Sequence, residues 1–281
     1  MNKKPYLLLC YVFCMVISGS AQNAADGAKD HFANVGDIKM HYKIYGKGDP
    51  IILLHGSLES MEDWDKQVPE LSKKYKVITV DSRGHGQTTF TDRKMDYILL
   101  SEDISALMVE LKIDSAFVVG FGDGGITGLY LSLNHPEKVR RLVAIGANYK
   151  VDTTAVYGQI LDKVKAWDDD KMYQFIRNHF KGYQNYGQIT QFTQRMKTML
   201  LTEPNLTLDD LKKIACPTLL IAGDHDIIKI DHTNAMFENI PNAYMCIVPG
   251  TKHYPQKESA LLVNSIILDF INKKFAKLER F

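Results

Sequence analysis

The residues best suited to chemistry are a glycine-rich stretch, Gly120–Gly125 (GFGDGG), and two later side chains, Asp226 and His253. Asp226 and His253 each follow a short apolar run, and a carboxylate can hold an imidazole in the tautomer that acts as a general base. The stretch matches G-x-S-x-G, a sharp turn that exposes a nucleophilic serine, except that Gly122 replaces the serine. Because glycine has no side chain, an acyl-enzyme cannot form at position 122.

Two backbone amides could stabilise negative charge beside this position. Ser57 follows His55 and Gly56 at the end of an apolar run, and Asp123 follows Gly122. In such turns, the amides of these two positions point at a developing oxyanion. The Asp123 carboxylate either binds a cationic group of a substrate or bonds within the turn, and the sequence leaves both open.

Three other polar residues near these motifs are expected to have structural roles. His55 is expected to shape the loop that carries Ser57, and His85 is expected to hold its own loop, Arg-Gly-His-Gly. Asp224 lies two residues before Asp226 and is interpreted as a turn residue. No paired C-x-x-C pattern is present, so no metal site is predicted.

The glycine-rich stretch also matches G-x-G-x-x-G, the phosphate-binding turn of dinucleotide-binding folds. That turn normally follows the first strand and needs an acid at the end of the next strand, about 20 residues on. Here it follows the third buried apolar run, and the next run ends in Ala-Ile-Gly-Ala-Asn-Tyr, without an acid. Neither a nicotinamide nor a flavin is therefore expected, and no other cofactor is predicted.

These side chains must be positioned by a regular framework. Short apolar runs alternate with segments of helical spacing, which predicts an α/β fold with a mostly parallel sheet and helices on both faces. Apolar and polar residues alternate over residues 31–46, which predicts an edge hairpin. The runs are Pro50–Gly56, Tyr75–Asp81, Ala116–Gly122, Arg140–Gly146, Pro217–Asp224 and Ala243–Gly250, and the helical segments are Met61–Lys74, Tyr97–Leu111 and Gly124–His135.

One long segment departs from this alternation. Tyr149–Ile214 contains no apolar strand run, but it has helical spacing and many aromatic residues. We interpret it as a helical cap inserted between two strands. Most of its aromatic side chains are expected to pack internally, and some are expected to line a substrate pocket between the cap and the sheet.

Five motifs together resemble the α/β-hydrolase fold-1 superfamily over nearly the whole chain after residue 21. They are HG at 55–56, DSRGHGQT at 81–88, GFGDGG at 120–125, GDHD at 223–226 and PGTKH at 249–253. The turn is most similar to G-W-S-D-G-G of the valacyclovir hydrolase (biphenyl hydrolase-like) group. The resemblance implies that Gly122 occupies the nucleophile position and that Asp226 and His253 are the triad acid and base. It also implies an oxyanion hole at Ser57 and Asp123.

The first residues resemble a secretory signal. Lys3 and Lys4 precede an apolar run, Tyr6–Ile17, and small residues follow up to Ala21. We expect residues 1–21 to be removed, residues 22–30 to form a flexible lead-in, and residues 31–281 to form the domain, in the periplasm or outside the cell. The run is short for a membrane span, although an uncleaved anchor is the alternative.

Composition limits the partners. The 281 residues include 45% hydrophobic side chains, enough for one large core. The 34 basic and 33 acidic side chains nearly cancel, so a nucleic-acid partner is not expected. Cys216 and Cys246 are expected to be buried thiols, although an oxidising compartment would permit a disulfide. A small-molecule substrate is expected, and no membrane partner after signal cleavage. The oligomeric state cannot be read from the sequence.

The missing serine leaves four interpretations. The chain is an inactivated form of a serine enzyme, a binding protein that kept the pocket, a protein whose His253 and Asp226 act without a covalent step, or one in which Ser57 or Asp123 replaces the nucleophile. Loss of a triad nucleophile costs about a millionfold in rate and leaves roughly 10³–10⁴ over water. The intact acid and histidine motifs favour chemistry on a small ester or amide, with non-catalytic small-molecule binding as the alternative.

Overall fold

The computed structural model describes residues 28–183 and 185–273. The signal peptide predicted over residues 1–21 and most of the lead-in predicted over residues 22–30 lie outside the described residues. Within the described ranges, every helix is too short or too polar to span a bilayer.

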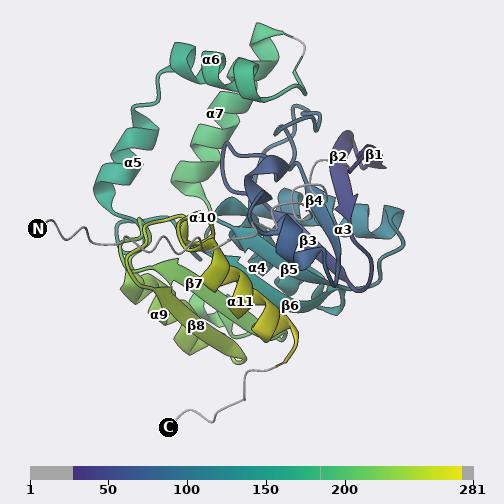
Figure 1. The fold of residues 1–281 in the computed structure, drawn as a ribbon. Coiled ribbons are helices and arrows are strands. Elements are labelled where there is room, and N and C mark those ends of the chain that lie inside the picture. The colour runs from purple at the N-terminus through teal and green to yellow at the C-terminus, as the bar shows by residue number, and fades with distance from the viewer. Residues whose placement is uncertain (1–27, 184, 274–281) are drawn as a thin grey trace, which may run out of the picture.

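One sheet of eight strands forms the centre of the molecule (Figure 1). Its order is β1-β2-β4-β3-β5-β6-β7-β8. Strand β2 pairs antiparallel with β1 and β4, and all other pairs are parallel. The predicted hairpin forms β1 and β2, and the six predicted runs form β3 to β8. The strands are β1 (Asp30–Val35), β2 (Ile38–Tyr45), β3 (Pro50–Leu54), β4 (Lys76–Val80), β5 (Ala116–Phe121), β6 (Val139–Ile145), β7 (Thr218–Gly223) and β8 (Ala243–Val248).

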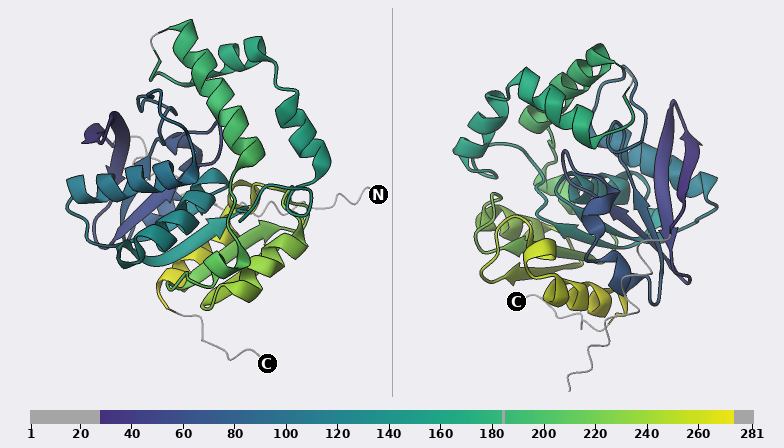
Figure 2. Two further views of the ribbon diagram at one scale, coloured as in Figure 1. Left: turned by 180° about the vertical axis from the view of Figure 1, so that it is seen from behind. Right: turned by 45° about the horizontal axis from the view of Figure 1, so that its top comes forward.

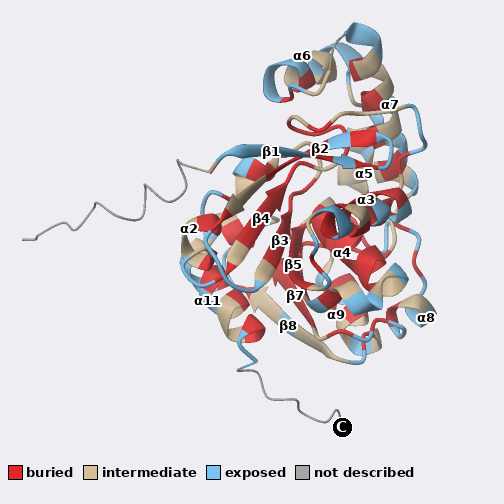
Figure 3. Ribbon diagram, turned by 90° about the vertical axis from the view of Figure 1, so that its right-hand side faces the viewer, coloured by how far each residue is buried: buried red, intermediate tan, exposed pale blue. Residues whose placement is uncertain are grey.

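Helices cover both faces of the sheet, as predicted (Figure 3). Alternate side chains of the buried strands enter opposite cores, because successive side chains of a strand point to opposite faces. Ile51 and Leu53 of β3 pack in one core with α2 and α11, whereas Ile52 and Leu54 pack in the other with α3, α4 and α9. The helices are α2 (Val68–Leu71), α3 (Tyr97–Glu110), α4 (Asp123–Asn134), α9 (Ile230–Asn239) and α11 (Ala260–Ile271).

The predicted helix over Met61–Lys74 is wrong in extent. A 3₁₀ turn, η1 (Met61–Trp64), and the four-residue α2 replace it. Ser60 caps η1 through a reciprocal capping box, which starts the segment as expected. Pro69 then lies in the first turn of α2. Proline lacks the amide hydrogen that a continuous helix would need there, and its ring would clash with the preceding turn.

Between β6 and β7 the chain forms a layer of helices above the carboxyl ends of the strands, within the stretch predicted as a cap (Figures 1 and 2). Helix α7 contacts both α5 and α6. These elements are α5 (Gly158–Lys165), α6 (Asp169–His179) and α7 (Tyr186–Thr202), and the short α8 (Leu208–Leu211) leads back toward the sheet.

Two short backbone contacts hold the stem of the cap. Lys150 pairs with Asn205 where the chain leaves and re-enters the main domain. Val156 pairs with Ile228, which lies in the loop after β7. The cap stem is therefore joined directly to a loop at the end of the sheet.

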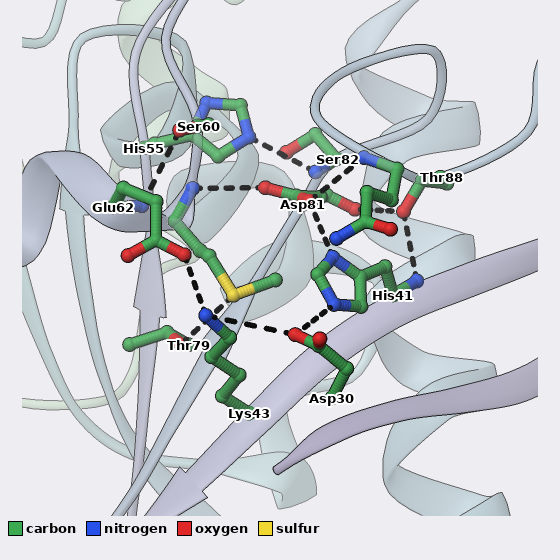
Figure 4. Close-up of polar contacts among 12 residues, drawn as sticks. Asp30, His41, Lys43, His55, Ser60, Glu62, Thr79, Asp81, Ser82 and Thr88 are labelled. Atoms are coloured by element: carbon green, nitrogen blue, oxygen red, sulfur yellow. Dashed lines mark hydrogen bonds and ion pairs between the residues drawn. The ribbon is translucent and has the colours of Figure 1, made fainter. Parts of the chain in front are cut away.

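A network of charged side chains centred on the buried His41 and Asp81 fastens the edge hairpin to the loops beneath the cap (Figure 4). His41 of β2 places Nδ1 2.7 Å from Asp81 Oδ2 and Nε2 2.9 Å from Asp30 Oδ1. Asp81 also accepts hydrogen bonds from the amides of Met61 and Gln87. Asp30, the last residue of the predicted flexible lead-in, is thus the first residue of β1 and is tied to its neighbour.

The charge on His41 should stabilise the fold in a pH-dependent way. Burial opposes the charge, but the bonds to Asp81 and Asp30 outweigh it and raise the pKa of His41. The stabilisation is therefore fully present below the unfolded pKa of about 6.5 and is lost as pH rises through the higher folded pKa.

His41→Leu should lower the free energy of unfolding by about 3 kcal/mol near pH 6, because it leaves Asp81 buried without its cation. The loss should be smaller at pH 9, as measured by urea denaturation at both pH values. The exposed His31 of the same hairpin supplies a control, His31→Leu. An equal loss at both pH values for His41→Leu would contradict this assignment of charge.

Candidate active site

The glycine-rich stretch forms a sharp turn between β5 and α4. Gly122 has φ 51° and ψ −118°, a conformation that side-chain-bearing residues rarely adopt. Its amide donates to the Ile145 carbonyl at 2.9 Å, and its carbonyl accepts from the Ile126 amide at 3.0 Å. The turn therefore lies at the carboxyl end of the sheet and opens directly into a helix, as the motif predicts.

Crowding of the main chain requires glycine at two positions of this turn. A Cβ on Gly124 would lie 2.0 Å from the Leu54 carbonyl oxygen of β3. A Cβ on Gly120 would lie 2.2 Å from the carbonyl oxygen of Gly124. Because these neighbours are backbone atoms, no side-chain rotation could relieve the clash.

Gly122 is different, because nothing crowds the position of its missing side chain. A Cβ there would lie 3.6 Å from Gly56 Cα and 4.0 Å from His253 Nε2, which are ordinary contacts. The space between Gly122 and His253 could therefore hold a serine side chain, and its Oγ could reach Nε2. Packing does not require glycine at position 122, and only the positive φ favours it.

The structure brings Asp226 and His253 together. Asp226 lies after β7 and His253 lies after β8, and their Oδ1 and Nδ1 atoms are 2.6 Å apart. The Asp226 side chain is fully buried, and its Oδ1 also accepts from the Ile228 amide at 3.0 Å. A carboxylate at Nδ1 favours the tautomer with its proton there, which leaves Nε2 to accept a proton. Nε2 has no hydrogen-bond partner among the described residues.

Asp224 lies apart from this pair. Its carboxylate accepts from the amides of Gly250 and Thr251 and bonds to the ring of His225. The hydrogen bond from the Gly250 amide contributes most to lowering the pKa of Asp224. The residue thereby holds the turn that leads to His253.

His55 and His85 each bond to their own loop and to the loop of the other histidine. His55 donates from Nδ1 to the adjacent Gly56 carbonyl, and its Nε2 accepts from the Ser82 amide at 3.0 Å (Figure 4). His85 bonds to the Arg83 carbonyl, and its Nε2 accepts from the Leu58 amide at 3.3 Å. Burial lowers the pKa of His85 to about 3. Both nitrogens of each ring are thus engaged by main-chain groups, so the two histidines join the two loops.

The two predicted oxyanion residues are joined through their side chains. Ser57 donates from Oγ to Asp123 Oδ2 at 2.5 Å, and the Tyr97 hydroxyl donates to Asp123 Oδ1 at 2.7 Å. Burial raises the pKa of Asp123. The Asp123 amide is in the first turn of α4, where helical amides lack intrahelical acceptors. Neither this amide nor that of Ser57 donates to any acceptor in the described part of the chain.

Tyr97 was not identified from the sequence, where it reads as the apolar start of a helix. A second missed group is the pair formed by Glu59 and Lys257. Glu59 Oε2 accepts from the Gly56 amide at 3.0 Å, and its Oε1 lies 3.4 Å from Lys257 Nζ. Burial is the main cause of the raised pKa of Glu59. Lys257 follows His253 by one helical turn, so this pair ties the oxyanion loop to the histidine loop.

A cavity of about 270 Å³ lies beneath the cap, next to the turn at Gly122. Gly122, His253 and Ser57 lie on its wall, and apolar side chains of the cap form much of the rest, namely Ile160, Leu161, Val164, Trp167 and Leu200. Two carboxylates, Asp123 and Glu203, also line it, whereas no lysine or arginine does among the described residues. Glu203 directly follows α7, and its Oε1 lies 3.7 Å from Nζ of the exposed Lys94.

Known proteins share this fold. Residues 49–182 match the family model described as alpha/beta hydrolase fold. The chain is 25% identical over 250 residues to serine hydrolase BPHL of Homo sapiens, covering 84% of each. It is 26% identical over 270 residues to 2-hydroxy-6-oxo-6-(2'-aminophenyl)hexa-2,4-dienoic acid hydrolase of Metapseudomonas resinovorans, covering 87% of this chain and 91% of the relative. An enol-lactonase from Burkholderia xenovorans has the same fold, with TM-score 0.72 and 20% identity over 86% of this chain and 100% of that chain.

Gly122→Ser should create a reactive nucleophile, because its Oγ would lie within reach of His253 Nε2. A fluorophosphonate probe, detected by intact-protein mass spectrometry, should label Gly122→Ser and leave the wild type, which has no nucleophile at residue 122, unlabelled.

Adding His253→Ala to Gly122→Ser should abolish this labelling, whereas Gly122→Ala should stay unlabelled like the wild type. If Gly122→Ser folds normally by circular dichroism and remains unlabelled, a side-chain oxygen at residue 122 does not lie within reach of His253 Nε2.

Proposed function

Because the chain belongs to the α/β-hydrolase superfamily, we propose that it is an exported hydrolase that cleaves a small ester or amide without a covalent intermediate. His253 acts as the general base and Asp226 orients it. One observation carries this proposal. The base is held at 2.6 Å by a buried carboxylate and faces open space at Gly122, where a serine side chain would otherwise stand.

Water takes the place of the serine hydroxyl. As its oxygen attacks the substrate carbonyl carbon, His253 Nε2 accepts its proton, and the imidazolium is stabilised by Asp226. The carbonyl oxygen becomes an oxyanion beside the amides of Ser57 and Asp123. The tetrahedral intermediate then collapses. The leaving oxygen or nitrogen takes the proton from Nε2, which restores the neutral base.

The shape and polarity of the cavity support a small substrate with an apolar body. Most of the cavity wall is apolar, and the cap supplies much of it. Asp123 and Glu203 add negative charge without a neighbouring lysine or arginine on the wall. The Asp123 carboxylate is held by two hydroxyls, so Glu203 is the freer of the two to meet a cation. We therefore propose that a positively charged group on the substrate is favoured.

Export is the part of the proposal that rests on the sequence. Lys3, Lys4, the apolar run Tyr6–Ile17 and the small residues before Ala21 support a cleaved signal. The protein would then act in the periplasm or outside the cell.

The wild type should hydrolyse small nitrophenyl esters at roughly 10³–10⁴ times the uncatalysed rate, the activity that remains when a triad lacks its nucleophile. His253→Ala should lower this rate at least about 100-fold. Release of nitrophenolate measures both. An exposed histidine of the cap provides the control variant His179→Ala, which should keep the rate.

A non-catalytic binding protein on the same scaffold is the alternative, and Gly122 itself favours it. Under that alternative, the wild type binds small esters by calorimetry but releases no nitrophenolate above the rate without protein. His253→Ala would then change binding little. This outcome would refute the hydrolytic proposal.

Glu203→Gln should reduce the preference for positively charged esters about fivefold, since a partly exposed charge pair contributes about 1 kcal/mol. The comparison uses an amino-acid ester and its N-acetylated form, in the Gly122→Ser background to increase turnover, and the ratio of their kcat/KM values. Lys94→Gln removes the nearby cation without touching the cavity wall and should keep or increase the preference. A loss with Lys94→Gln equal to that with Glu203→Gln would refute the role of Glu203.

A further inference from the structure

The space between Gly122 and His253 has a consequence beyond hydrolysis. In a serine enzyme this space contains an oxygen that is covalently tethered to the chain. Here, whatever hydroxyl enters the space is an untethered molecule and leaves with the product. The identity of that molecule therefore decides which product forms.

The dimensions of the space suit one hydroxyl oxygen. His253 Nε2 lies 4.0 Å from the position of a Cβ on Gly122. Without that Cβ, the gap to the Gly122 main chain widens by up to about one carbon–carbon bond, roughly 1.5 Å. An oxygen needs about 2.7–3.2 Å from nitrogen and about 3.3–3.6 Å from carbon. A hydroxyl can therefore lie beside the line between Gly122 and Nε2, where a methyl group on residue 122 would crowd it.

The surroundings of the space favour an alkyl group over a second water molecule. Phe121 packs against the ring of His253, with ring centroids 4.9 Å apart. Leu58, Ile126 and Ile227 line the cavity into which the space opens. An alcohol that places its oxygen at Nε2 can point its carbon atoms toward these side chains, where burial of apolar surface is favourable.

We propose that the site is an acyltransferase site for small primary alcohols, in which an alcohol occupies the space beside Gly122 and attacks the acyl donor directly. This inference rests on the proposed function, because it uses the same base and the same oxyanion amides. The chemical class of the donor is a small ester, and the product is the ester of the acceptor alcohol.

The step balances without an oxidant or a metal. The alcohol oxygen forms a bond to the acyl carbon while His253 Nε2 accepts the alcohol proton. The acyl oxygen becomes an oxyanion beside the amides of Ser57 and Asp123. The bond from the acyl carbon to the leaving oxygen then breaks, and the leaving oxygen receives the proton from Nε2.

The test supplies 4-nitrophenyl butyrate with increasing methanol and measures two quantities. Nitrophenolate release gives the total turnover, and gas chromatography separates methyl butyrate from butyric acid. We expect release to rise and saturate with methanol, without a burst, because methanol takes part in the first bond-forming step. The ratio of methyl butyrate to butyric acid should exceed the molar ratio of methanol to water at least about tenfold, which corresponds to about 1.4 kcal/mol.

Two variants separate the space from general effects of mutation. Gly122→Ala places a methyl group in the space and should lower ester transfer more than tenfold. Gly36→Ala is the matched control, because Gly36 also has a positive φ (+55°) and a Cβ there would meet nothing within 4 Å. Its transfer rate should equal that of the wild type. tert-Butanol, whose three methyl groups crowd its hydroxyl oxygen, controls for solvent effects and should yield much less ester than methanol.

The outcomes distinguish the two proposals. No nitrophenolate release above the protein-free rate means that the proposed hydrolysis fails, and transfer fails with it. In a second outcome, nitrophenolate is released but the ratio of methyl butyrate to butyric acid does not exceed the molar ratio of methanol to water. This result overturns transfer and leaves hydrolysis intact. Equal transfer by Gly122→Ala and the wild type also overturns the assignment of the acceptor to this space.

Discussion

The arrangement of the site depends on the contact of one helix start with the end of one strand. At Gly124 and Gly120 the main chain approaches neighbouring carbonyls so closely that a Cβ would lie within 2.0–2.2 Å of them. This contact fixes where α4 begins, and so it fixes the conformation of Gly122 and the direction of the Asp123 amide. None of these features needs a side chain at residue 122. The turn can therefore keep its geometry when the nucleophile is absent.

The second half of the site comes from the loops after β7 and β8 and is held by charge. Asp226 is fully buried beside His253, and a buried carboxylate is costly unless it is bonded. The bonds from the His253 ring and the Ile228 amide stabilise it through Oδ1, whereas Oδ2 is buried without a hydrogen-bond partner among the described residues. Glu59 and Lys257 join the loop that carries Gly56 to the segment after His253. The base and the oxyanion amides are thus positioned by separate contacts, and Glu59 and Lys257 connect their two loops.

Much of the framework could be predicted because its signals are local. A strand buried on both faces reads as a continuous apolar run, and each of the six runs forms a strand. The helix predicted over Met61–Lys74 is wrong because Pro69 interrupts a segment whose apolar spacing is otherwise helical. The pairing of Asp226 with His253 followed from their order after adjacent strands. Tyr97, Glu59 and Glu203 were missed because their partners lie far away in sequence or in the cap, where no short motif records the contact.

The stem of the cap makes the base sensitive to motion. Val156 pairs with Ile228, and the Lys229 amide donates to the Ala155 carbonyl at 2.8 Å. Ile228 is also the residue whose amide holds Asp226 Oδ1. A shift of the cap stem therefore reaches the carboxylate through two hydrogen-bonded steps of main chain. Movement of the cap over a ligand would thus be transmitted to the carboxylate that positions the imidazole, so access to the cavity and alignment of the base are mechanically coupled.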